Sequence, residues 1–381
     1  MNTTGNNILI ITGEPSGDMR GAELLKELKP LVGNISFWGI GGDRLEAEGL
    51  ELIEHVRNLS IVGVWEALKS IGTIRSQYKK CVENIRRRKP TAVILVDYPG
   101  FNLRIAKYLH KHNIPVIYYI IPQVWAWGEG RVTQLKRYTD KILVLFEFEK
   151  RFLQKHNVAS DFVGHPIVDI KVDFTTNSEK REGLTVALLP GSRASEIKNL
   201  FPDMLRSARI LHTYYSGKIN FIVAENSNLD GALYGELLSG YTDLTIRRVK
   251  DNAPQALADS DFALITSGTA TLEATITQTP SLLLYRTAPL TAFLFYTFLN
   301  LPYVGLVNII AGKEVTPELL QKDVTPEKVS EKALEMLTDE HRMEQARNDL
   351  QKVKESLGNV GAAKRTAISI AAFLDSLSES V

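Results

Sequence analysis

Short apolar runs alternate with amphipathic stretches along most of the chain. In the N-terminal half the runs predict strands at Ile8–Ile11, Ser36–Gly39, Ala92–Val96, Pro115–Ile120, Lys141–Val144 and Phe162–Val163. In the C-terminal half they predict strands at Val186–Leu189, Asn220–Val223, Leu244–Arg247, Phe262–Ile265 and Ser281–Tyr285. The stretches between them have helical spacing, as in Met19–Leu28. This alternation predicts an α/β fold with parallel, doubly wound sheets.

A chain of 381 residues is too long for one ordinary hydrophobic core. The pattern breaks at Gly164-His165-Pro166 and again over the polar stretch 173–183. We therefore expect two Rossmann-like domains facing a central cleft, at 1–165 and 166–325, with ligands at the carboxyl ends of the strands. Thr325-Pro326 is a good N-cap and N1 pair, and it opens a third segment of helices at 326–381.

Three predicted strands run straight into a small-residue turn that opens a helix, at 13–18, 190–196 and 266–273. A helix start presents unpaired backbone N–H groups and the positive end of the helix dipole, and glycine lets an anion approach them. Two of the turns lie in the second half, ~75 residues apart, and together they predict one diphosphate held between them.

The turn at 266–273 offers hydroxyl groups and backbone N–H groups for a phosphate. The residues concerned are Ser267, Gly268, Thr269, Ala270 and Thr271. Glu273 lies one turn inside the helix, where its carboxylate either reaches a ribose diol or is exposed on a well-capped helix. In the turn at 190–196, Arg193 follows Gly191 and Ser192, and its guanidinium suits a diphosphate leaving group. Glu196 is interpreted as a capping-box carboxylate for the same helix.

Asp97 directly follows the apolar strand Ala92–Val96 and precedes Pro99. At the carboxyl end of a central strand it is placed to accept a proton from an attacking hydroxyl. An Asp before a Pro is also a common turn or cap residue, and the sequence does not separate the two interpretations.

Charge is unevenly spread in a chain whose formal net charge is +1. Between residues 57 and 89, nine basic residues stand against two acidic ones, so something anionic is expected to approach there. The helix predicted in this region has an apolar start formed by Ile61, Val62, Val64, Trp65 and Leu68. It is either a core helix or, with its basic surround, a peripheral membrane contact or acyl-chain pocket.

Two further features bear on location. Cys81 is the only cysteine, which fits a reducing compartment, and the polar N-terminus lacks the features of an export signal. Residues 287–312 are uncharged and long enough to span a bilayer. Interruptions such as Pro302 and Asn308 favour buried core or a surface resting on lipid instead.

No metal or cofactor is expected. Asp259-Ser260-Asp261 resembles a metal motif but precedes a strand, at the end away from the ligands, so we interpret it as a turn. The seven histidines show no ligand spacing. His165 is interpreted as a structural residue between the domains, with a role near the cleft as the alternative.

Several sequence blocks, in order along the chain, resemble the bacterial lipid-A-disaccharide synthases. They are Gly13-Glu14-Pro15-Ser16-Gly17-Asp18, Gly39-Ile40-Gly41-Gly42, Pro122-Gln123-Val124-Trp125-Ala126-Trp127, Phe162-Val163-Gly164-His165-Pro166, the turn at 189–196 and the turn at 267–273. The match runs to about residue 325, and the Pro-Gln-Val-Trp-Ala-Trp block is the most specific part of it.

The resemblance implies a GT-B glycosyltransferase of lipid A and lipopolysaccharide biosynthesis. It would move 2,3-diacylglucosamine from UDP to 2,3-diacylglucosamine 1-phosphate with inversion. Asp97 would be the base, Arg193 and Asn308 would be functional, and Glu14, Ser16 and Asp18 would lie on the acceptor side. The apolar start of the helix at 61–68 would contact lipid at the cytoplasmic face of the inner membrane. The C-terminal helices would pack back on the N-terminal domain or be swapped in a homodimer.

The acceptor side departs from the family pattern at three places. Ile121 stands where a Ser is expected, Gly100 where a second acid is often found, and Gly128 where a basic residue is more usual, which leaves Arg131 as the nearest cation. Two rival functions remain, a UDP-sugar 2-epimerase of related fold and a non-catalytic membrane adaptor that binds nucleotide.

Overall fold

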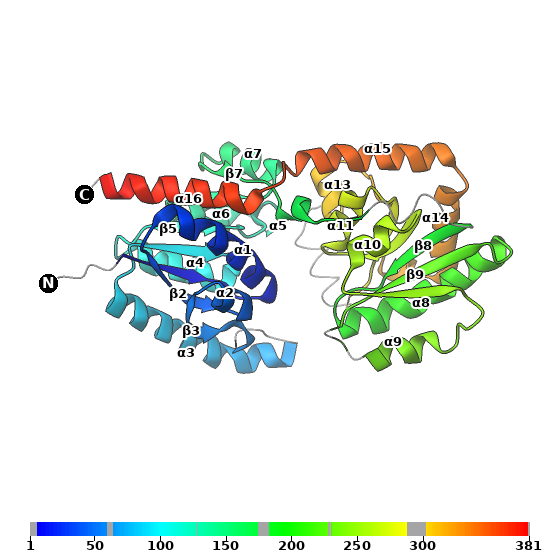
Figure 1. Cartoon of the computed structure of the whole chain (residues 1–381), viewed down its shortest axis with the longest axis horizontal. Helices are drawn as coiled ribbons and strands as arrows, with labels where there is room; N and C mark the ends of the chain where they lie inside the picture. The colour runs from blue at the N-terminus through cyan, green and yellow to red at the C-terminus, as the bar shows by residue number, and fades with distance from the viewer. Residues whose placement is uncertain are drawn as a thin grey trace. The chain divides into compact units, whose positions relative to one another are not determined.

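The computed structural model describes residues 6–58, 64–127, 129–173, 183–227, 229, 231–287 and 302–379. The chain divides into two compact units, one of Met1–Pro166 with Leu357–Val381 and the other of Ile167–Ser356. Each unit has a sheet of parallel strands with helices packed against it (Figure 1).

The first unit has, within the described residues, a seven-stranded sheet in the order β3-β2-β1-β4-β5-β6-β7. The strands are β1 (Asn7–Ile11), β2 (Ser36–Gly41), β3 (Glu51–His55), β4 (Ala92–Val96), β5 (Val116–Tyr119), β6 (Lys141–Val144) and β7 (Asp161–Phe162). The helices are α1 (Pro15–Val32), α2 (Asp43–Ala47), α3 (Val64–Arg88), α4 (Pro99–His110), α5 (Val124–Trp127), α6 (Glu129–Tyr138), α7 (Glu147–Lys155) and α16 (Ala362–Glu379). Successive strands are added on one side of β1 up to β3 and on the other side from β4 onward, so the order of the strands reverses between β1 and β4.

The second unit repeats this plan with six described strands in the order β10-β9-β8-β11-β12-β13. The strands are β8 (Leu184–Leu189), β9 (Ile219–Glu225), β10 (Ile246–Lys250), β11 (Phe262–Thr266), β12 (Ser281–Tyr285) and β13 (Glu318–Leu320). The helices are α8 (Ala194–Tyr214), α9 (Gly231–Leu238), α10 (Ala253–Ala258), α11 (Ala270–Thr277), α13 (Leu306–Ala311), α14 (Pro326–Leu337) and α15 (Glu340–Ser356). Here the order reverses between β8 and β11, so both units are doubly wound and the predicted fold class is confirmed.

The central strands of both sheets are fully buried, which explains why their apolar runs are continuous rather than alternating. The sequence pattern missed two strands, β3 and β13. Both lie at sheet edges, and β3 carries Glu51 and Glu54 while β13 is only three residues long. These two edge strands lack the apolar run that identifies a central strand, whereas the other two edge strands, β7 and β10, overlap predicted runs.

The C-terminal segment is divided between the units. Helices α14 and α15 belong to the second unit, whereas α16 belongs to the first and packs along α1 (Figure 1). The start of α16 is tied down by Arg365, whose Nε donates to the carbonyl of Val163 at 2.9 Å. The backbone N–H of His165 donates to the carbonyl of Leu357 at 2.8 Å in the same place.

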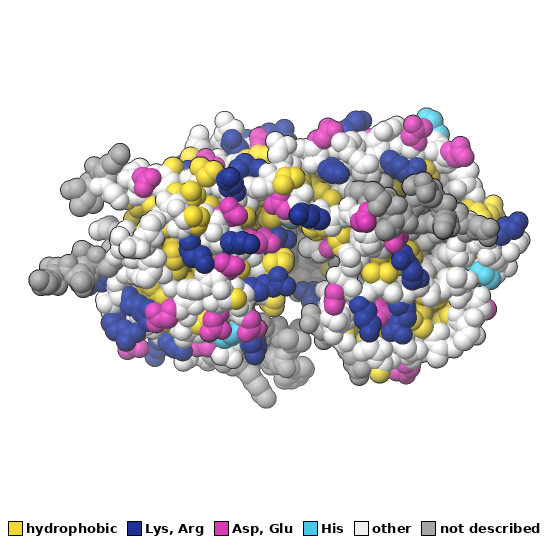
Figure 2. All heavy atoms as spheres, in the orientation of Figure 1, with side chains coloured by type: hydrophobic (Ala, Val, Ile, Leu, Met, Phe, Trp, Pro, Cys, Tyr) yellow, Lys and Arg dark blue, Asp and Glu magenta, His cyan; other side chains and the backbone are white. Residues whose placement is uncertain are grey.

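The basic segment is partly neutralised by acidic residues that precede it in the sequence. Figure 2 shows Lys and Arg side chains gathered over the α3 and β3 side of the first unit, interspersed with acidic ones. The ion pairs are Arg57–Asp43, Lys80–Glu54 and Arg88–Glu51, at 2.6, 2.9 and 2.5 Å. Counting charge in a sequence window therefore overstated the positive field of this face.

The expected lipid-contacting residues lie at or beyond the limit of the described structure. Ile61 and Val62 are outside the described residues, and α3 begins at Val64 with the side chains of Val64, Trp65 and Leu68 not described. Residues 288–301 of the uncharged stretch are also outside. Among the helices that are described, none has the length and apolar character needed to cross a bilayer.

Candidate active site

The turns predicted from the sequence leave the sheets where the strand order reverses. In the first unit, β1 pairs with β4, so the turn at 13–18 and Asp97 begin at the same edge. In the second unit, β8 pairs with β11 with Leu189 opposite Ile265, so the turns at 190–193 and 267–269 are neighbours. Ligands of open α/β sheets bind at such positions.

Asp97 is held in a backbone conformation that L-residues rarely adopt. Asp97 and Tyr98 have φ angles of 50° and 48°. The Asp97 N–H donates to the Tyr119 carbonyl at 3.1 Å, and the Asp97 carbonyl accepts from Asn102 Nδ2 at 2.7 Å and from the Tyr118 hydroxyl at 2.9 Å. Backbone strain of this kind, of order 1–3 kcal/mol per residue, persists where surrounding contacts enforce it, and it is concentrated at functional sites.

The ring of Tyr98 occupies the space beside Gly13. A Cβ atom at Gly13 would lie 2.0 Å from that ring, so the glycine is required by the position of Tyr98. Tyr98 is itself the N-cap of α4, without a side-chain capping bond. Asp97 therefore does not serve as the helix cap, one of the two structural roles that the sequence left open; the other, a residue of the turn before Pro99, fits its positive φ.

The electrostatics of Asp97 suit a general base. Burial raises the pKa of its carboxyl to about 6, the charge of Glu14 raises it further, and a hydrogen bond from the Tyr98 N–H opposes the shift. A carboxylate with a pKa near 6 is ionised at neutral pH and still basic enough to share a proton in a transition state.

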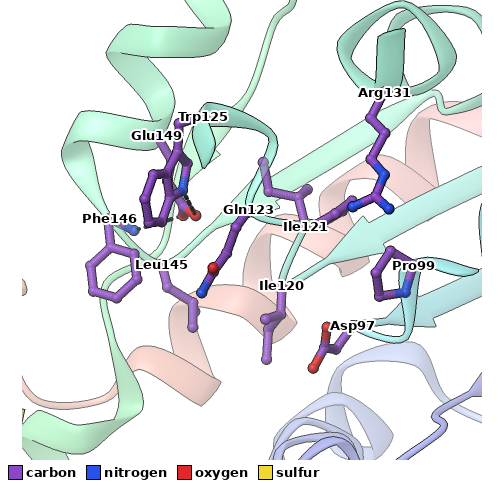
Figure 3. Close-up of a pocket in the computed structure, with 11 residues that line it drawn as sticks. Asp97, Pro99, Ile120, Ile121, Gln123, Trp125, Arg131, Leu145, Phe146 and Glu149 are labelled. Atoms are coloured by element: carbon purple, nitrogen blue, oxygen red, sulfur yellow. Dashed lines mark hydrogen bonds between the residues drawn. The ribbon is translucent and has the colours of Figure 1, made fainter. Parts of the chain in front are cut away.

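Beside Asp97 lies a cavity of about 280 Å³ (Figure 3). Its lining consists of Asp97, Pro99, Ile120, Ile121, Pro122, Gln123, Trp125, Arg131, Leu145, Phe146 and Glu149. Ile120 has a φ of 60°, which is strained for a β-branched side chain. The Pro-Gln-Val-Trp-Ala-Trp block thus forms one wall of the cavity next to Asp97.

A second acid in this cavity, Glu149, was not singled out from the sequence. Its Oε1 accepts from Trp125 Nε1 at 3.3 Å (dashed in Figure 3), and its Oε2 accepts from the Phe146 N–H at 3.3 Å. Burial raises the pKa of Glu149 to about 7. It lies in an amphipathic helix with a second glutamate, Glu147, and the sequence of that helix gave no signal that Glu149 is the buried one.

The turn at 13–18 carries two exposed polar side chains and one buried one. Glu14 and Ser16 are exposed at the start of α1. Asp18 is buried, and its carboxylate accepts from the N–H groups of Gly42, Arg44 and Leu45 at 2.6, 3.1 and 3.2 Å. Asp18 therefore fixes the start of α2.

In the second unit, the turn at 190–193 is organised by Glu196. Its Oε2 accepts from the N–H groups of Ser192 and Arg193 at 3.0 and 3.3 Å, and its Oε1 pairs with Arg193 Nη1 at 3.0 Å. Gly191 has a φ of 114°, and a Cβ there would lie 2.5 Å from Glu196 Oε2. The capping role expected of Glu196 is confirmed, and the exposed Arg193 side chain is left at the surface.

The turn at 267–269 opens α11 with accessible backbone. Gly268 has a φ of 138° with open space around it, and Thr269 is exposed. The Thr271 hydroxyl is used internally, donating to the Gly268 carbonyl at 3.0 Å. Glu273 is half-buried rather than exposed, and desolvation raises the pKa of its carboxyl.

Asn308 has no hydrogen-bonding capacity left for a ligand. Its side-chain oxygen accepts from the Val315 and Thr316 N–H groups at 2.7 and 2.9 Å. Its amide nitrogen donates to the Thr316 carbonyl at 2.7 Å and to Glu318 Oε1 at 2.8 Å. Asn308 is fully buried, and it holds Glu318 and the turn before β13 in place.

The Asp259-Ser260-Asp261 segment and His165 are held by contacts within the fold. Asp259 ends α10, Asp261 Oδ2 accepts from the Thr185 N–H at 2.8 Å, and no group of residues in the described ranges could hold a metal ion. His165 is buried and stacked on Phe146, with ring centroids 5.2 Å apart. Burial lowers the pKa of His165 to about 3, so it is neutral.

Solved structures with the same fold include several proteins of nucleotide-sugar chemistry. A putative UDP-N-acetylglucosamine 2-epimerase from Listeria monocytogenes matches with a TM-score of 0.62 at 13% identity, over 97% of both chains. S. aureus MnaA, in a structure with UDP, matches with 0.62 at 14% identity over 97% of both chains. The glycotransferase of kitacinnamycin matches with 0.62 at 14%, over 96% of this chain and 98% of the other. At these identities they show the fold alone, which is GT-B.

Sequence comparison goes further than the fold. The model of the lipid-A-disaccharide synthetase family matches residues 8–372. The lipid-A-disaccharide synthase of Myxococcus xanthus (strain DK1622) is 37% identical over 375 residues, covering 97% of both chains. That of Persephonella marina is 37% identical over 372 residues, covering 94% of this chain and 96% of the relative. The chain therefore belongs to the lipid-A-disaccharide synthase family and is a glycosyltransferase.

Proposed function

We propose that this chain transfers 2,3-diacylglucosamine from UDP to 2,3-diacylglucosamine 1-phosphate, also called lipid X. The products are the β-1,6-linked lipid A disaccharide 1-phosphate and UDP. Family membership supports the reaction, and one structural observation supports the mechanism. A strained, half-buried carboxylate with a raised pKa lies beside a cavity in the first unit, at the point where the strand order reverses.

The donor diphosphate binds the two neighbouring turns of the second unit. Backbone N–H groups of Gly268–Ala270 and the hydroxyls of Ser192, Ser267 and Thr269 face it beside Gly191, and Glu273 reaches the ribose. The Ser192 N–H stays bonded to Glu196 and organises the turn. A helix N-terminus contributes about 0.3–1 kcal/mol to an exposed anion. Arg193 therefore supplies much of the leaving-group stabilisation, and its exposed guanidinium needs only to exchange Glu196 for phosphate oxygens.

Asp97 accepts the proton of the acceptor 6-hydroxyl. As the O6–C1 bond forms, the bond between C1 and the diphosphate oxygen breaks, and UDP leaves with the electron pair. One displacement inverts the anomeric carbon, so one base and one stabilised leaving group suffice. Glu14 and Ser16 border the acceptor, and Asp18 acts as a positioning residue because its carboxylate is used by the start of α2.

An assay with the two lipid substrates tests this function. With UDP-diacylglucosamine and lipid X together, mass spectrometry should show the disaccharide 1-phosphate and one UDP per disaccharide. With the UDP-sugar alone, the donor should be recovered unchanged. Conversion of the donor alone to its 2-epimer would support the epimerase alternative, and UDP binding without any product would support the adaptor.

Both substrates carry acyl chains, so we propose that the protein works at the cytoplasmic face of the inner membrane. The apolar residues Ile61, Val62, Val64, Trp65 and Leu68 would enter the lipid. Exposed cations on α3, such as Arg75 and Lys79, would attract anionic head groups.

Replacing Ile61, Val64 and Trp65 with Ser should reduce co-sedimentation with anionic liposomes several-fold and leave UDP affinity unchanged, because burial of apolar side chains drives insertion. A variant with Leu31, an exposed apolar residue on α1, replaced by Ser is the control. Unchanged sedimentation of the triple variant would show that these residues do not contact lipid.

A further inference from the structure

The cavity next to Asp97 has one basic residue among its described lining residues, Arg131 on α6. Its side chain is half-buried. Within the described part of the chain it has no ion pair and no hydrogen bond, unlike Arg57, Arg88 or Arg193, which are paired with carboxylates. A guanidinium that lines a cavity without a counter-charge is a candidate anion receptor.

Arg131 and Asp97 reach the cavity from different elements. Figure 3 shows the Arg131 guanidinium coming from α6 and the Asp97 carboxylate from the end of β4, with Pro99 between them. They do not form an ion pair, and Arg131 is absent from the causes that shift the pKa of Asp97. A ligand that carries both an anionic group and a reacting hydroxyl would contact both.

The other acid of the cavity, Glu149, neither pairs with Arg131 nor carries a full negative charge near neutral pH. Glu149 is held by Trp125 and the Phe146 backbone rather than by Arg131. Because burial raises its pKa to about 7, a large share of Glu149 is uncharged near neutral pH. The cavity therefore holds Asp97 and Arg131 as its main charges. Its volume of about 280 Å³ suits a single sugar ring with a phosphate, and the acyl chains would lie outside it.

Resting on the proposed function, we infer that Arg131 binds the 1-phosphate of the acceptor sugar and thereby orients its 6-hydroxyl toward Asp97. In lipid X the ring carbons that carry the phosphate and the hydroxymethyl group, C1 and C5, both flank the ring oxygen, so the phosphate and the 6-hydroxyl are separate groups within reach of two side chains that enter one cavity. Arg131 would select a phosphorylated acceptor over a free sugar.

The test compares lipid X with 2,3-diacylglucosamine that has a free 1-hydroxyl. The unmodified enzyme should prefer the phosphorylated acceptor in kcat/KM. Arg131→Gln should lower kcat/KM for lipid X about 10- to 100-fold, mainly through KM, because a charge-assisted bond to phosphate is lost. It should change the value for the free sugar less than threefold, and Arg131→Lys should retain part of the preference.

Arg137→Gln is the matched control, since Arg137 lies exposed on the same helix and outside the cavity lining. It should behave like the unmodified enzyme. Equal losses with both acceptors, no loss with lipid X, or no preference in the unmodified enzyme would each overturn the role of Arg131. Absence of disaccharide from the unmodified enzyme with either acceptor would instead count against the proposed function.

Discussion

Replacing Asp97 with Asn should lower the transfer rate by about three orders of magnitude, because general-base catalysis contributes roughly 10²–10⁴-fold. The amide has nearly the same shape, so the strained turn with Tyr98 and its three backbone hydrogen bonds should survive. UDP affinity, measured by calorimetry, should be unchanged because the donor turns belong to the second unit. Retention of more than a tenth of the activity would exclude Asp97 as the base.

The same substitution should stabilise the protein at neutral pH. The pKa of Asp97 is about 6 in the fold against 3.8 for the ordinary carboxyl. Well below pH 3.8 both states are protonated and the folded state has no penalty. As the pH rises from about 4 to 6 the unfolded state loses its proton first, so stability falls. The amide of Asp97→Asn carries no charge, and we expect a gain of about 1–3 kcal/mol in the free energy of unfolding at neutral pH.

The pH profile of the unmodified enzyme should show the same titration. Activity should fall about tenfold per pH unit below about pH 6, as the base becomes protonated. The acceptor phosphate also titrates near pH 6. Asp97→Glu separates the two, because the acidic limb should move if Asp97 is responsible and stay in place if the substrate is.

Much of this site could be predicted because the chemistry follows strand ends. A buried parallel strand is a continuous apolar run, and the residue after it lies at the edge where ligands bind. That logic places Asp97, Arg193 and Gly268 on the correct edges of their sheets. It fails where a strand has no apolar run, as in β3 with Glu51 and Glu54 or the three-residue β13, whereas the edge strands β7 and β10 were at least partly predicted.

The sequence does not reveal which polar side chains are buried and which hydrogen bonds they make. Asp18 and Glu149 are ordinary acids in the sequence, yet one is saturated by backbone N–H groups and the other is buried beside Trp125. These states depend on contacts between segments far apart in the chain. The ion pairs of the basic face arise in the same way, from Asp43, Glu51 and Glu54, which lie outside the basic segment.

Asn308→Ala should destabilise the second unit by at least about 4 kcal/mol. The substitution leaves the N–H groups of Val315 and Thr316, the Thr316 carbonyl and Glu318 without the amide that now satisfies them. Each buried group stranded in this way costs about 1–3 kcal/mol, and a small cavity adds to the loss. Urea unfolding followed by fluorescence should show an earlier transition.

Asn199→Ala, an exposed position on α8, is the matched control and should change stability by less than about 0.5 kcal/mol. Glu318 also accepts from the N–H groups of Val304 and Gly305, so its displacement would disturb the start of α13 beside Thr271. Loss of transfer in Asn308→Ala should therefore be accompanied by loss of stability. A variant that unfolds like the unmodified protein and yet fails to transfer would show that Asn308 contacts the substrate directly, as its resemblance to the family residue implies.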